Sequence, residues 1–425
     1  MIVMMELLKK RTFTPLFLTQ FFGAFNDNAF KFAMLTLISY YLTSSQNQSE
    51  LYQALAGALY IAPFFFLSAT AGQLADKFNK ALLTRLIKFF EIIIVSTGSM
   101  ALYFGNTMYL MATLLGLGIH STFFGPIKYA ILPEQLPCQS LLGATALIEA
   151  STFLAILFGT VLGTLSIGGI KAGAWCAILL TGVVAIAGFI ASLFILPGKN
   201  IGTNLRIEWN FVRATSQMIK EVLLSKNIGP IVFAISWFWL IGAVMLTKLP
   251  DYTSYVLRAD KVVFSVFLSL FSIGIALGSM SINRILNGRI TIKYVPHSMF
   301  LLSLFGFDLY LSTPTQYNTA YLQGVVQFFS QLMHWRIAVD LFFLAFSAGL
   351  FVVPLYTYLQ VAGDGDVRAR TIASNNIFNA LFMISGTCLV MVLLHLHVPI
   401  AAVFFILSIL NCCSAIIFWF IFPKV

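Results

Sequence analysis

The stretch QFFGAFNDNAFKFAML, residues 20–35, carries four strongly polar side chains inside a long apolar run: Asn26, Asp27, Asn28 and Lys31. The run around them is long enough for one helix to cross the hydrocarbon layer of a membrane, which takes about 20 residues. A carboxylate near the middle of such a helix costs about 2.5–3.5 kcal/mol. We therefore expect this polar face to point into the interior of a helix bundle or a water-filled cavity.

The rest of the chain extends the same pattern. Of its 425 residues, 59% are hydrophobic and only 9% are charged, whereas a soluble domain carries about 25% charged residues. The composition therefore predicts an all-α integral membrane protein. Twelve apolar runs predict its membrane spans, near residues 14–42, 51–75, 82–104, 107–127, 140–167, 173–197, 229–256, 262–283, 292–312, 337–361, 371–394 and 398–422.

The basic residues predict the orientation of these spans. If the N-terminus is cytoplasmic, the inner segments hold nineteen Lys and Arg residues, Lys88 among them, and the outer loops hold only Lys171, Arg258 and Lys261. Basic residues accumulate on the cytoplasmic side of membrane proteins, so both termini are expected there. Basic residues next to anionic lipid also explain the net charge of +10, and no nucleic-acid partner is needed.

A polar segment divides the chain into six spans and six. Its apolar residues recur at helical spacing, and Arg206, Arg213 and Lys220 repeat every seven residues on another face. This pattern predicts an amphipathic helix on the inner membrane surface. The predicted domains are an N-terminal six-helix half at 1–198, this linker at 199–226 and a C-terminal half at 227–425. Two halves that rock around a central site are the plan of major facilitator transporters.

The turn after the second span, GQLADKFNK, supports that plan. It resembles the major facilitator loop signature G-x-L-x-D-[RK]-x-G-[RK] at Gly72, Asp76, Lys77 and Lys80, and these residues are predicted to gate the transporter. Asn79 replaces the usual glycine, but Asn tolerates the left-handed backbone that a tight turn can need. The alternative interpretation is an ordinary cytoplasmic turn with mixed charges.

The polar face of the first span has two interpretations. Asp27 and Lys31 are four residues apart, so they could form an ion pair that only braces the helix. That pair leaves Asn26 and Asn28 unexplained, and a binding cavity accounts for all four residues. Lys248 in the seventh span is the predicted opposite charge to Asp27 across this cavity. A lysine that extends to the outer membrane surface is the alternative for Lys248.

Further polar residues lie in the other spans. Glu149 is predicted to be buried in the fifth span, where Gly159 and Gly163 indicate close helix packing. Arg336 and Asp340 are four residues apart and predict a local ion pair. Asn375, Asn376 and Asn379 form a polar stripe whose expected role is hydrogen bonding between helices. The five histidines are scattered without an evident partner, and neither they nor the cysteines have metal-ligand spacing, so no metal site or cofactor is expected.

Several segments resemble the bacterial lysophospholipid transporters of the major facilitator superfamily. They are GAFNDNAFK, STFFGPIKYAILP, SWFWLIGAVMLTKLP, VDLFFLAFSAGLFVVPLYTYLQ and RARTIASNNIFNALFM. The same likeness extends to proteins that fuse this transporter to an acyltransferase and an acyl carrier protein synthetase. Here such a partner is expected to be a separate polypeptide.

This resemblance implies a function. Lysophosphatidylethanolamine and lysophosphatidylglycerol would be moved from the outer to the inner leaflet of the inner membrane for reacylation. Asp27 corresponds to the family's first-span acid and Lys248 to its basic residue in the seventh span, while Lys128 and Glu149 match polar cavity positions. Together with Asn26, Asn28 and Lys31, these are the predicted substrate-binding residues, and a monomer is expected.

Three other functions stay open, and one is a non-transporting relative of the facilitators that acts as a scaffold or sensor. A proton- or ion-coupled permease for small solutes would use Asp27 or Glu149 as its proton carrier. A membrane-bound acyltransferase would need a His-x4-Asp pair for general-base catalysis, and the residues at that spacing after His120, His297 and His334 are Gly125, Leu302 and Val339. The chain also lacks a P-loop, so no enzyme activity or catalytic residue is predicted.

Overall fold

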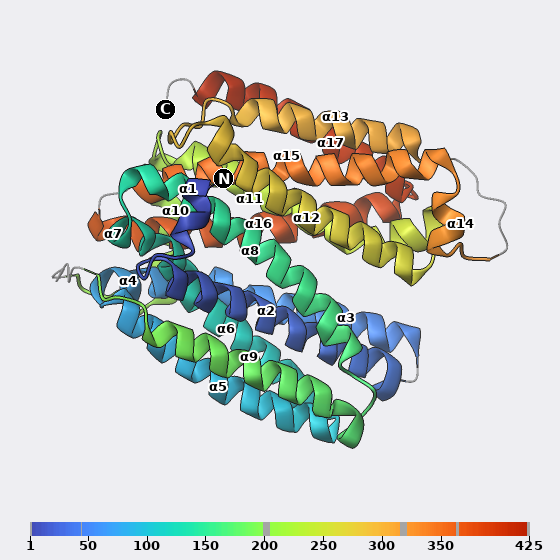
Figure 1. Cartoon of the computed structure of the whole chain (residues 1–425), viewed down its shortest axis with the longest axis horizontal. Coiled ribbons are helices and arrows are strands. Elements are labelled where there is room, and N and C mark those ends of the chain that lie inside the picture. Colours follow the sequence, from blue (N-terminus) through green and yellow to red (C-terminus); the bar gives the residue numbers. More distant parts are fainter. Residues whose placement is uncertain (1, 44, 199–204, 315–320, 363–364, 423–425) are drawn as a thin grey trace. The chain divides into compact units, whose positions relative to one another are not determined.

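The computed structural model describes residues 2–43, 45–198, 205–314, 321–362 and 365–422, and these residues form helices joined by short connections (Figure 1). The first group of helices is α1 (Ile2–Leu7), α2 (Thr14–Leu37), η1 (Ile38–Leu42), α3 (Gln46–Phe66), α4 (Ser68–Lys77), α5 (Lys80–Phe104), α6 (Thr107–Ala130), α7 (Leu132–Gln135), α8 (Cys138–Leu165), η2 (Lys171–Ala174), α9 (Trp175–Leu193) and α10 (Phe211–Leu224). The second is α11 (Gly229–Asp251), η3 (Tyr252–Val256), α12 (Lys261–Ile285), α13 (Val295–Ser312), α14 (Val325–Phe329), α15 (Leu332–Ala362), η4 (Gly365–Val367), α16 (Arg368–His395) and α17 (Ile400–Ile421).

These helices confirm the predicted all-α membrane fold with twelve spans. Among the described residues, nine helices are long and apolar enough to cross a membrane, and α3 with α4 forms a tenth span bent by 49°. The remaining two are α2 and α13, whose composition is more polar because they carry buried or ion-paired charges such as Asp27 and Asp308. The protein is therefore a multi-pass membrane protein.

Contacts divide the chain into two units. Unit 1 comprises residues 1–224 and 359–380, and unit 2 comprises 225–358 and 381–425. The end of α15 and the start of α16 thus belong with the N-terminal helices. The predicted boundaries at 198/199 and 226/227 remain a prediction, and residues 199–204 of the predicted linker lie outside the described residues.

Helix α10, in the predicted linker, packs on α3 and α4 within unit 1. Its buried side includes Met218 and Val222, and the ring of Phe211 meets that of Phe66 edge-on at 6.0 Å. Val212 and Leu223 lie on the exposed side. The helix therefore has apolar residues on the side that packs on the protein and on the side that is exposed. The predicted contact of this helix with the membrane surface stays a prediction.

Helix α2 is the central element of unit 1, because it packs against α6, α8 and α9. Small residues allow the close approach of α8: a side chain at Gly159 would meet the backbone of α2 at Phe25 and Ala29. Gly163 lies against the Ala29 backbone in the same way. The predicted role of these two glycines in close helix packing is confirmed.

Unit 2 has its own buried polar contacts. In α17, Asn411 accepts a hydrogen bond of 3.0 Å from the Trp237 indole of α11. The same amide donates to the Met299 carbonyl and the Ser303 hydroxyl of α13, each at 2.8 Å. One buried side chain thus ties three helices together, because a buried amide is costly unless its donors and acceptors are paired.

Candidate functional site

The polar residues of α2 lie in a cluster that draws on four helices of unit 1. We call it the Asp27 cluster, and it consists of Asn26 and Asp27 from α2, Tyr60 from α3, Lys88 and Glu91 from α5, and His120 and Ser121 from α6. The sequence predicted the first two residues as site residues and missed the other five. His120, for which the sequence showed no evident partner, places its Nε2 3.5 Å from Glu91 Oε2 without a hydrogen bond.

Glu91 is the buried acceptor at the middle of this cluster. Its Oε2 lies 2.7 Å from the ammonium of Lys88, three residues earlier on α5. Its Oε1 accepts a hydrogen bond of 3.1 Å from the amide of Asn26. The side chains of Lys88 and Glu91 are 0% and 1% exposed, so this ion pair is fully removed from water and lipid headgroups. The sequence placed Lys88 in a cytoplasmic segment, which is wrong.

Asp27 binds its partners through one oxygen only. Its Oδ2 accepts hydrogen bonds from the hydroxyl of Tyr60 at 2.9 Å and from the hydroxyl of Ser121. Its Oδ1 is buried and has no hydrogen-bond partner among the described residues. Asn26 Oδ1 and both ring nitrogens of His120 are also buried without a hydrogen bond. The cluster thus contains several buried polar atoms that are left unsatisfied.

Two glycines make this arrangement possible. Gly23 lies one helical turn before Asp27, and a β-carbon there would come within 2.5 Å of the Lys88 ammonium. Gly118 on α6 faces the backbone of α3 at Tyr60, where a β-carbon would lie 2.7 Å from the carbonyl oxygen. The missing side chains therefore leave space for the ammonium and let α3 bring Tyr60 next to Ser121.

The other two polar residues singled out on α2, Lys31 and Asn28, have contacts other than Asp27. The predicted ion pair between Asp27 and Lys31 is wrong, since the structure has no carboxylate oxygen within 4.0 Å of the Lys31 ammonium among the described residues. That ammonium lies over the rings of Phe32 and Tyr60, at 5.5 and 5.8 Å from their centroids. Asn28 donates to the Ala24 carbonyl of its own helix at 2.8 Å.

Lys128 and Glu149 both contact Tyr129, one through the ring and the other through the hydroxyl. The Tyr129 hydroxyl donates to Glu149 Oε1, and the Lys128 ammonium lies 4.6 Å from the centroid of the Tyr129 ring. Glu149 is buried as predicted, and its Oε2 has no hydrogen-bond partner among the described residues. The structure thus brings these two predicted residues together within unit 1, where one carboxylate oxygen remains unsatisfied.

Lys248 has a partner that the sequence analysis overlooked. Its ammonium lies 2.9 Å from Asp251, three residues later on α11 in unit 2, and its side chain is 21% exposed. Asp27 belongs to unit 1, so the predicted opposition of Asp27 and Lys248 stays a prediction.

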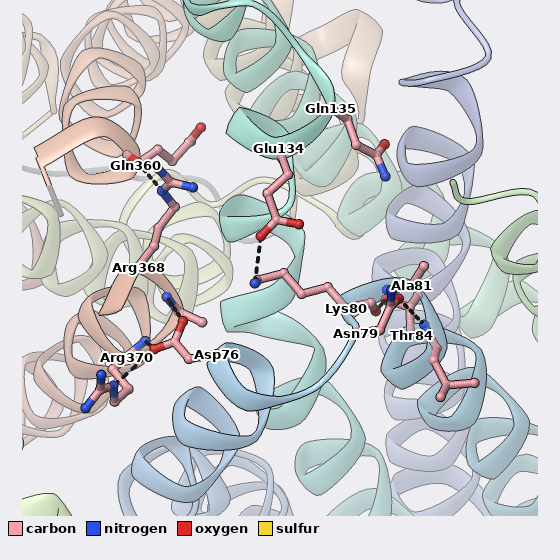
Figure 2. A network of polar contacts seen from close by, with 12 residues as sticks. Asp76, Asn79, Lys80, Ala81, Thr84, Glu134, Gln135, Gln360, Arg368 and Arg370 are labelled. Carbon is pink, nitrogen blue, oxygen red and sulfur yellow. Dashed lines mark hydrogen bonds and ion pairs between the residues drawn. The ribbon is translucent and has the colours of Figure 1, made fainter. Parts of the chain in front are cut away.

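The turn between α4 and α5, which resembles the major facilitator loop signature, belongs to a second network of polar contacts, shown in Figure 2. Asp76 at the end of α4 accepts hydrogen bonds from the backbone N–H groups of Ala369 and Arg370 at 2.8 and 3.1 Å, and from the Arg370 side chain at 3.1 Å. These donors lie in the first turn of α16, where backbone N–H groups lack helical partners and carry partial positive charge. Asp76 therefore caps α16 from outside.

Other residues of this turn hold it in place. Lys80 forms a buried ion pair of 2.7 Å with Glu134 of α7 (Figure 2). Asn79 caps α5 through its side-chain oxygen, with φ of −60°. The turn therefore does not use the left-handed backbone that Asn tolerates. Lys77 lies over the ring of Phe78 at 5.9 Å. Gly72 allows α4 to approach α16, because a β-carbon there would lie 2.6 Å from that of Ala373.

Two further predictions are corrected. The ion pair predicted between Arg336 and Asp340 is wrong: Arg336 binds Asp308 of α13 through two nitrogens, and Asp340 accepts a hydrogen bond of 3.0 Å from Ser312. Hydrogen bonding between helices is also wrong for Asn375, whose buried amide has no hydrogen-bond partner in the described part of the chain.

The other two residues of the predicted polar stripe on α16 are Asn376 and Asn379. Asn376 faces Gly125 of α6, and its Nδ2 has no hydrogen-bond partner among the described residues. Asn379 is buried on the same helix. Both amide atoms of Asn375 and the Nδ2 of Asn376 therefore remain without a hydrogen bond in the described part of the chain.

One sequence pattern could have revealed two of the cluster residues that the sequence analysis missed. Lys88 and Glu91 are opposite charges three residues apart inside the apolar run at 82–104, a spacing that places both on one helix face. His120 and Ser121 carried no such signal, because their partners lie on other helices.

Comparison with known proteins places this fold in a family. The sequence pattern of the Major Facilitator Superfamily matches residues 16–387. The chain belongs to this superfamily. It is also similar to proteins named lysophospholipid transporter LplT: 27% identical to the one from Yersinia enterocolitica, over 90% of this chain and 87% of that protein. The counterpart from Yersinia pestis is 27% identical over 93% of this chain and 90% of its own length. These relatives confirm the resemblance seen in the sequence.

Solved structures agree on the fold. The human organic anion transporter MFSD10 has a TM-score of 0.78 at 12% identity, with 96% of this chain and 98% of that chain covered. A bacterial homologue of the iron transporter ferroportin, in an outward-facing state, has a TM-score of 0.71 at 11% identity over 98% of this chain and 99% of the other. At such identities the likeness establishes the fold and nothing finer. The superfamily and these neighbours are membrane transporters.

Proposed function

We propose that this protein moves lysophosphatidylethanolamine and lysophosphatidylglycerol from the outer to the inner leaflet of the bacterial inner membrane, where a separate acyltransferase reacylates them. The observation that carries this proposal is the similarity to lysophospholipid transporters along about nine-tenths of the chain. Both termini would lie in the cytoplasm, and the protein would work as a monomer by alternating access, without a catalytic residue.

The buried charges suit such a substrate. A lysophospholipid headgroup carries an anionic phosphate together with an ammonium or hydroxyl groups. In this proposal Lys128 and Lys248 attract the phosphate, and Asp27 with Asn26 and Asn28 receives the ammonium or hydroxyl groups. Glu149 keeps one buried oxygen without a hydrogen bond, which leaves it able to accept a donor from the headgroup.

Lys31 has a different role in the proposal. Its ammonium lies over the Tyr60 ring, and the hydroxyl of the same tyrosine binds Asp27. Lys31 would thus hold Tyr60, and through it Asp27, between transport cycles. An ammonium over an aromatic face is attracted by about 0.5–2 kcal/mol, depending on how far it is removed from water.

The network around Asp76 would act as the cytoplasmic gate. Asp76 binds the start of α16 through three hydrogen bonds, and Gly72 permits the close approach of the two helices. Opening at this end would separate α4 from α16 and break these bonds, while Lys80 keeps its own partner on α7. The same motion is proposed to change the contacts of five further polar residues: Arg336, Asp340, Asn375, Asn376 and Asn379.

The first test is uptake of labelled lysophosphatidylethanolamine from the outer leaflet, in cells that lack other routes. We expect uptake by the wild type and at least a tenfold loss, about 1.4 kcal/mol, in Asp27→Ala and in Lys248→Ala. The matched control is Glu221→Ala, which removes an exposed carboxylate on α10. Membrane levels of each variant are measured alongside, so that a folding failure is recognised.

Two outcomes contradict the proposal. Normal uptake by Asp27→Ala would reduce that residue to a structural role. No uptake by the wild type would favour the alternative, an ion-coupled permease for small solutes. The fully buried acids of the Asp27 cluster are the observation that favours this alternative, and one solved neighbour is a fucose:proton symporter of Escherichia coli, with a TM-score of 0.71 at 12% identity over 96% of this chain and 97% of that one.

A further inference from the structure

The Asp27 cluster contains more hydrogen-bond acceptors than donors. Asp27 Oδ1 and Asn26 Oδ1 are buried oxygens without a donor, and both ring nitrogens of His120 lack a hydrogen bond as well. All three side chains are at most 5% exposed. Buried polar atoms in proteins nearly always have a partner, so atoms of this kind that point toward one another indicate a missing ligand.

Three residues of the cluster bring possible ligand atoms close together. One ligand atom each from Asp27, Glu91 and His120 can be chosen so that all lie within 4.8 Å of one another. An ion of the size of Na⁺ or Ca²⁺ binds oxygen atoms at about 2.3–2.6 Å, so two of its ligands lie at most about 5 Å apart. The three groups therefore have the spacing of ligands around a single small cation.

The charges of the cluster favour a monovalent ion. Asp27 and Glu91 are two carboxylates, and the Lys88 ammonium at 2.7 Å neutralises one of them. No other ammonium or guanidinium lies within 4.0 Å of either carboxylate in the described part of the chain, since Lys31 lies over the rings of Phe32 and Tyr60. With both acids ionised, one negative charge is left in an apolar interior, where net charge is costly. A monovalent cation balances it, whereas a divalent ion would leave an excess positive charge.

The donor atoms point to the same class of ion. The oxygens of Asp27, Asn26 and Glu91 are hard ligands of the kind that bind alkali and alkaline-earth ions, while a transition-metal site would use more imidazole or thiolate ligands. His120 is the single imidazole of the cluster. We propose that Asn26, Asp27, Glu91 and His120 bind one sodium ion inside unit 1. This proposal departs from the sequence prediction of no metal site. Since the proposed function assigns Asn26 and Asp27 to the ammonium or hydroxyl groups of the headgroup, the sodium ion and those groups would occupy these oxygens in turn.

Lys88 gives the site its selectivity in this proposal. Its ammonium occupies one side of Glu91, held in place beside Gly23 and over the ring of Phe124 at 5.4 Å. It thereby removes one unit of negative charge from the site and excludes ions of higher charge. The pair is fully buried, so water does not screen this effect.

The test measures thermal unfolding of the purified protein in detergent, without any lysophospholipid, from its intrinsic tryptophan fluorescence. Sodium, potassium and choline chlorides are compared at constant ionic strength, because a ligand that binds only the folded state raises the unfolding temperature. We expect a saturable increase with sodium that potassium and choline do not reproduce. Direct binding of ²²Na⁺ to the same sample gives an independent measurement.

Two variants and one control locate the ion. Glu91→Gln is expected to abolish the sodium effect. Asn26→Ala keeps both carboxylates and the ion pair with Lys88, and it is expected to raise the sodium concentration at half effect about tenfold or more. Glu221→Gln removes an exposed carboxylate of unit 1 outside the cluster and is expected to keep the wild-type response.

Several outcomes would overturn the proposal. The same unfolding temperature in all three salts, with no bound ²²Na⁺, would mean that no sodium site exists. Stabilisation by Mn²⁺ or Zn²⁺ but not by sodium would replace it with a transition-metal site. If Glu91→Gln does not fold, an unchanged sodium response in Asn26→Ala decides against the site. Because lipid is absent from this assay, a failure of lysophospholipid uptake would leave its result unaffected, and the reverse also holds.

Discussion

Unit 1 contains two buried aspartates with opposite surroundings. Asp76 uses both carboxylate oxygens, which together accept three hydrogen bonds from the start of α16. Asp27 uses one oxygen for Tyr60 and Ser121 and leaves the other without a partner. A fully paired carboxylate holds two helices together, whereas a half-paired one has capacity left for a ligand. This difference in pairing, rather than in burial, is why we propose a gating role for Asp76 and a binding role for Asp27.

The largest expected effect comes from breaking the buried ion pair beside Asp27. Lys88→Met leaves Glu91 charged and unpaired, which is expected to lower the free energy of unfolding by about 3–5 kcal/mol. The double variant Lys88→Met/Glu91→Leu removes both charges and should recover most of that loss, because a well-packed apolar pair replaces a buried ion pair at little cost. The measurement is the unfolding temperature in detergent. A double variant no more stable than the single one would contradict this account of the pair.

A smaller effect is expected at the fully paired aspartate. Asp76→Ala removes the acceptor for two backbone N–H groups and one guanidinium, and a hydrogen bond to a charged group contributes about 1.5–3 kcal/mol. We expect a stability loss of about 1–3 kcal/mol, since water can partly replace the carboxylate at this end of α16. Asp76→Asn keeps an acceptor and should lose less. Equal losses in both variants would show that the charge alone matters.

The smallest effect is expected for the exposed ion pair of unit 2. The side chains of Arg336 and Asp308 are 44% and 35% exposed, and exposed pairs contribute about 0–1 kcal/mol. Arg336→Lys keeps the charge but loses the two-nitrogen contact, and its unfolding temperature should differ little from that of the wild type. Raised salt should narrow even this difference, because it screens exposed charges. A loss comparable to that of Lys88→Met would show that exposure does not weaken this pair.

The sequence predicted the spans well because apolar runs of about 20 residues have few alternatives to a membrane helix. It also predicted Asp27 as a site residue, since a carboxylate at the middle of such a run needs a partner. It could not predict Tyr60 or Ser121 as those partners, because the rotation of α3 and α6 relative to α2 depends on packing between helices that a single sequence does not encode locally.

Local spacing also misled in a consistent way. Asp27 with Lys31, and Arg336 with Asp340, have the i,i+4 spacing that permits an ion pair on one helix. In both cases another helix offers a better partner: the ring of Tyr60 on α3 for Lys31, and the Asp308 carboxylate on α13 for Arg336. Spacing alone therefore predicts what two side chains can do, and tertiary packing decides whether they do it.

The bend of 49° between α3 and α4 has a mechanical consequence. Pro63 lies one turn before the break at Leu67, and a proline inside a helix weakens its hydrogen bonding and kinks it. Tyr60, which binds Asp27, lies on one side of this joint, and Asp76, which caps α16, lies on the other. In the proposed gating motion, this bend would let α4 move away from α16 while the hydrogen bond between Tyr60 and Asp27 is kept. The proposed sodium site would then be little disturbed by movement at the other end of the span.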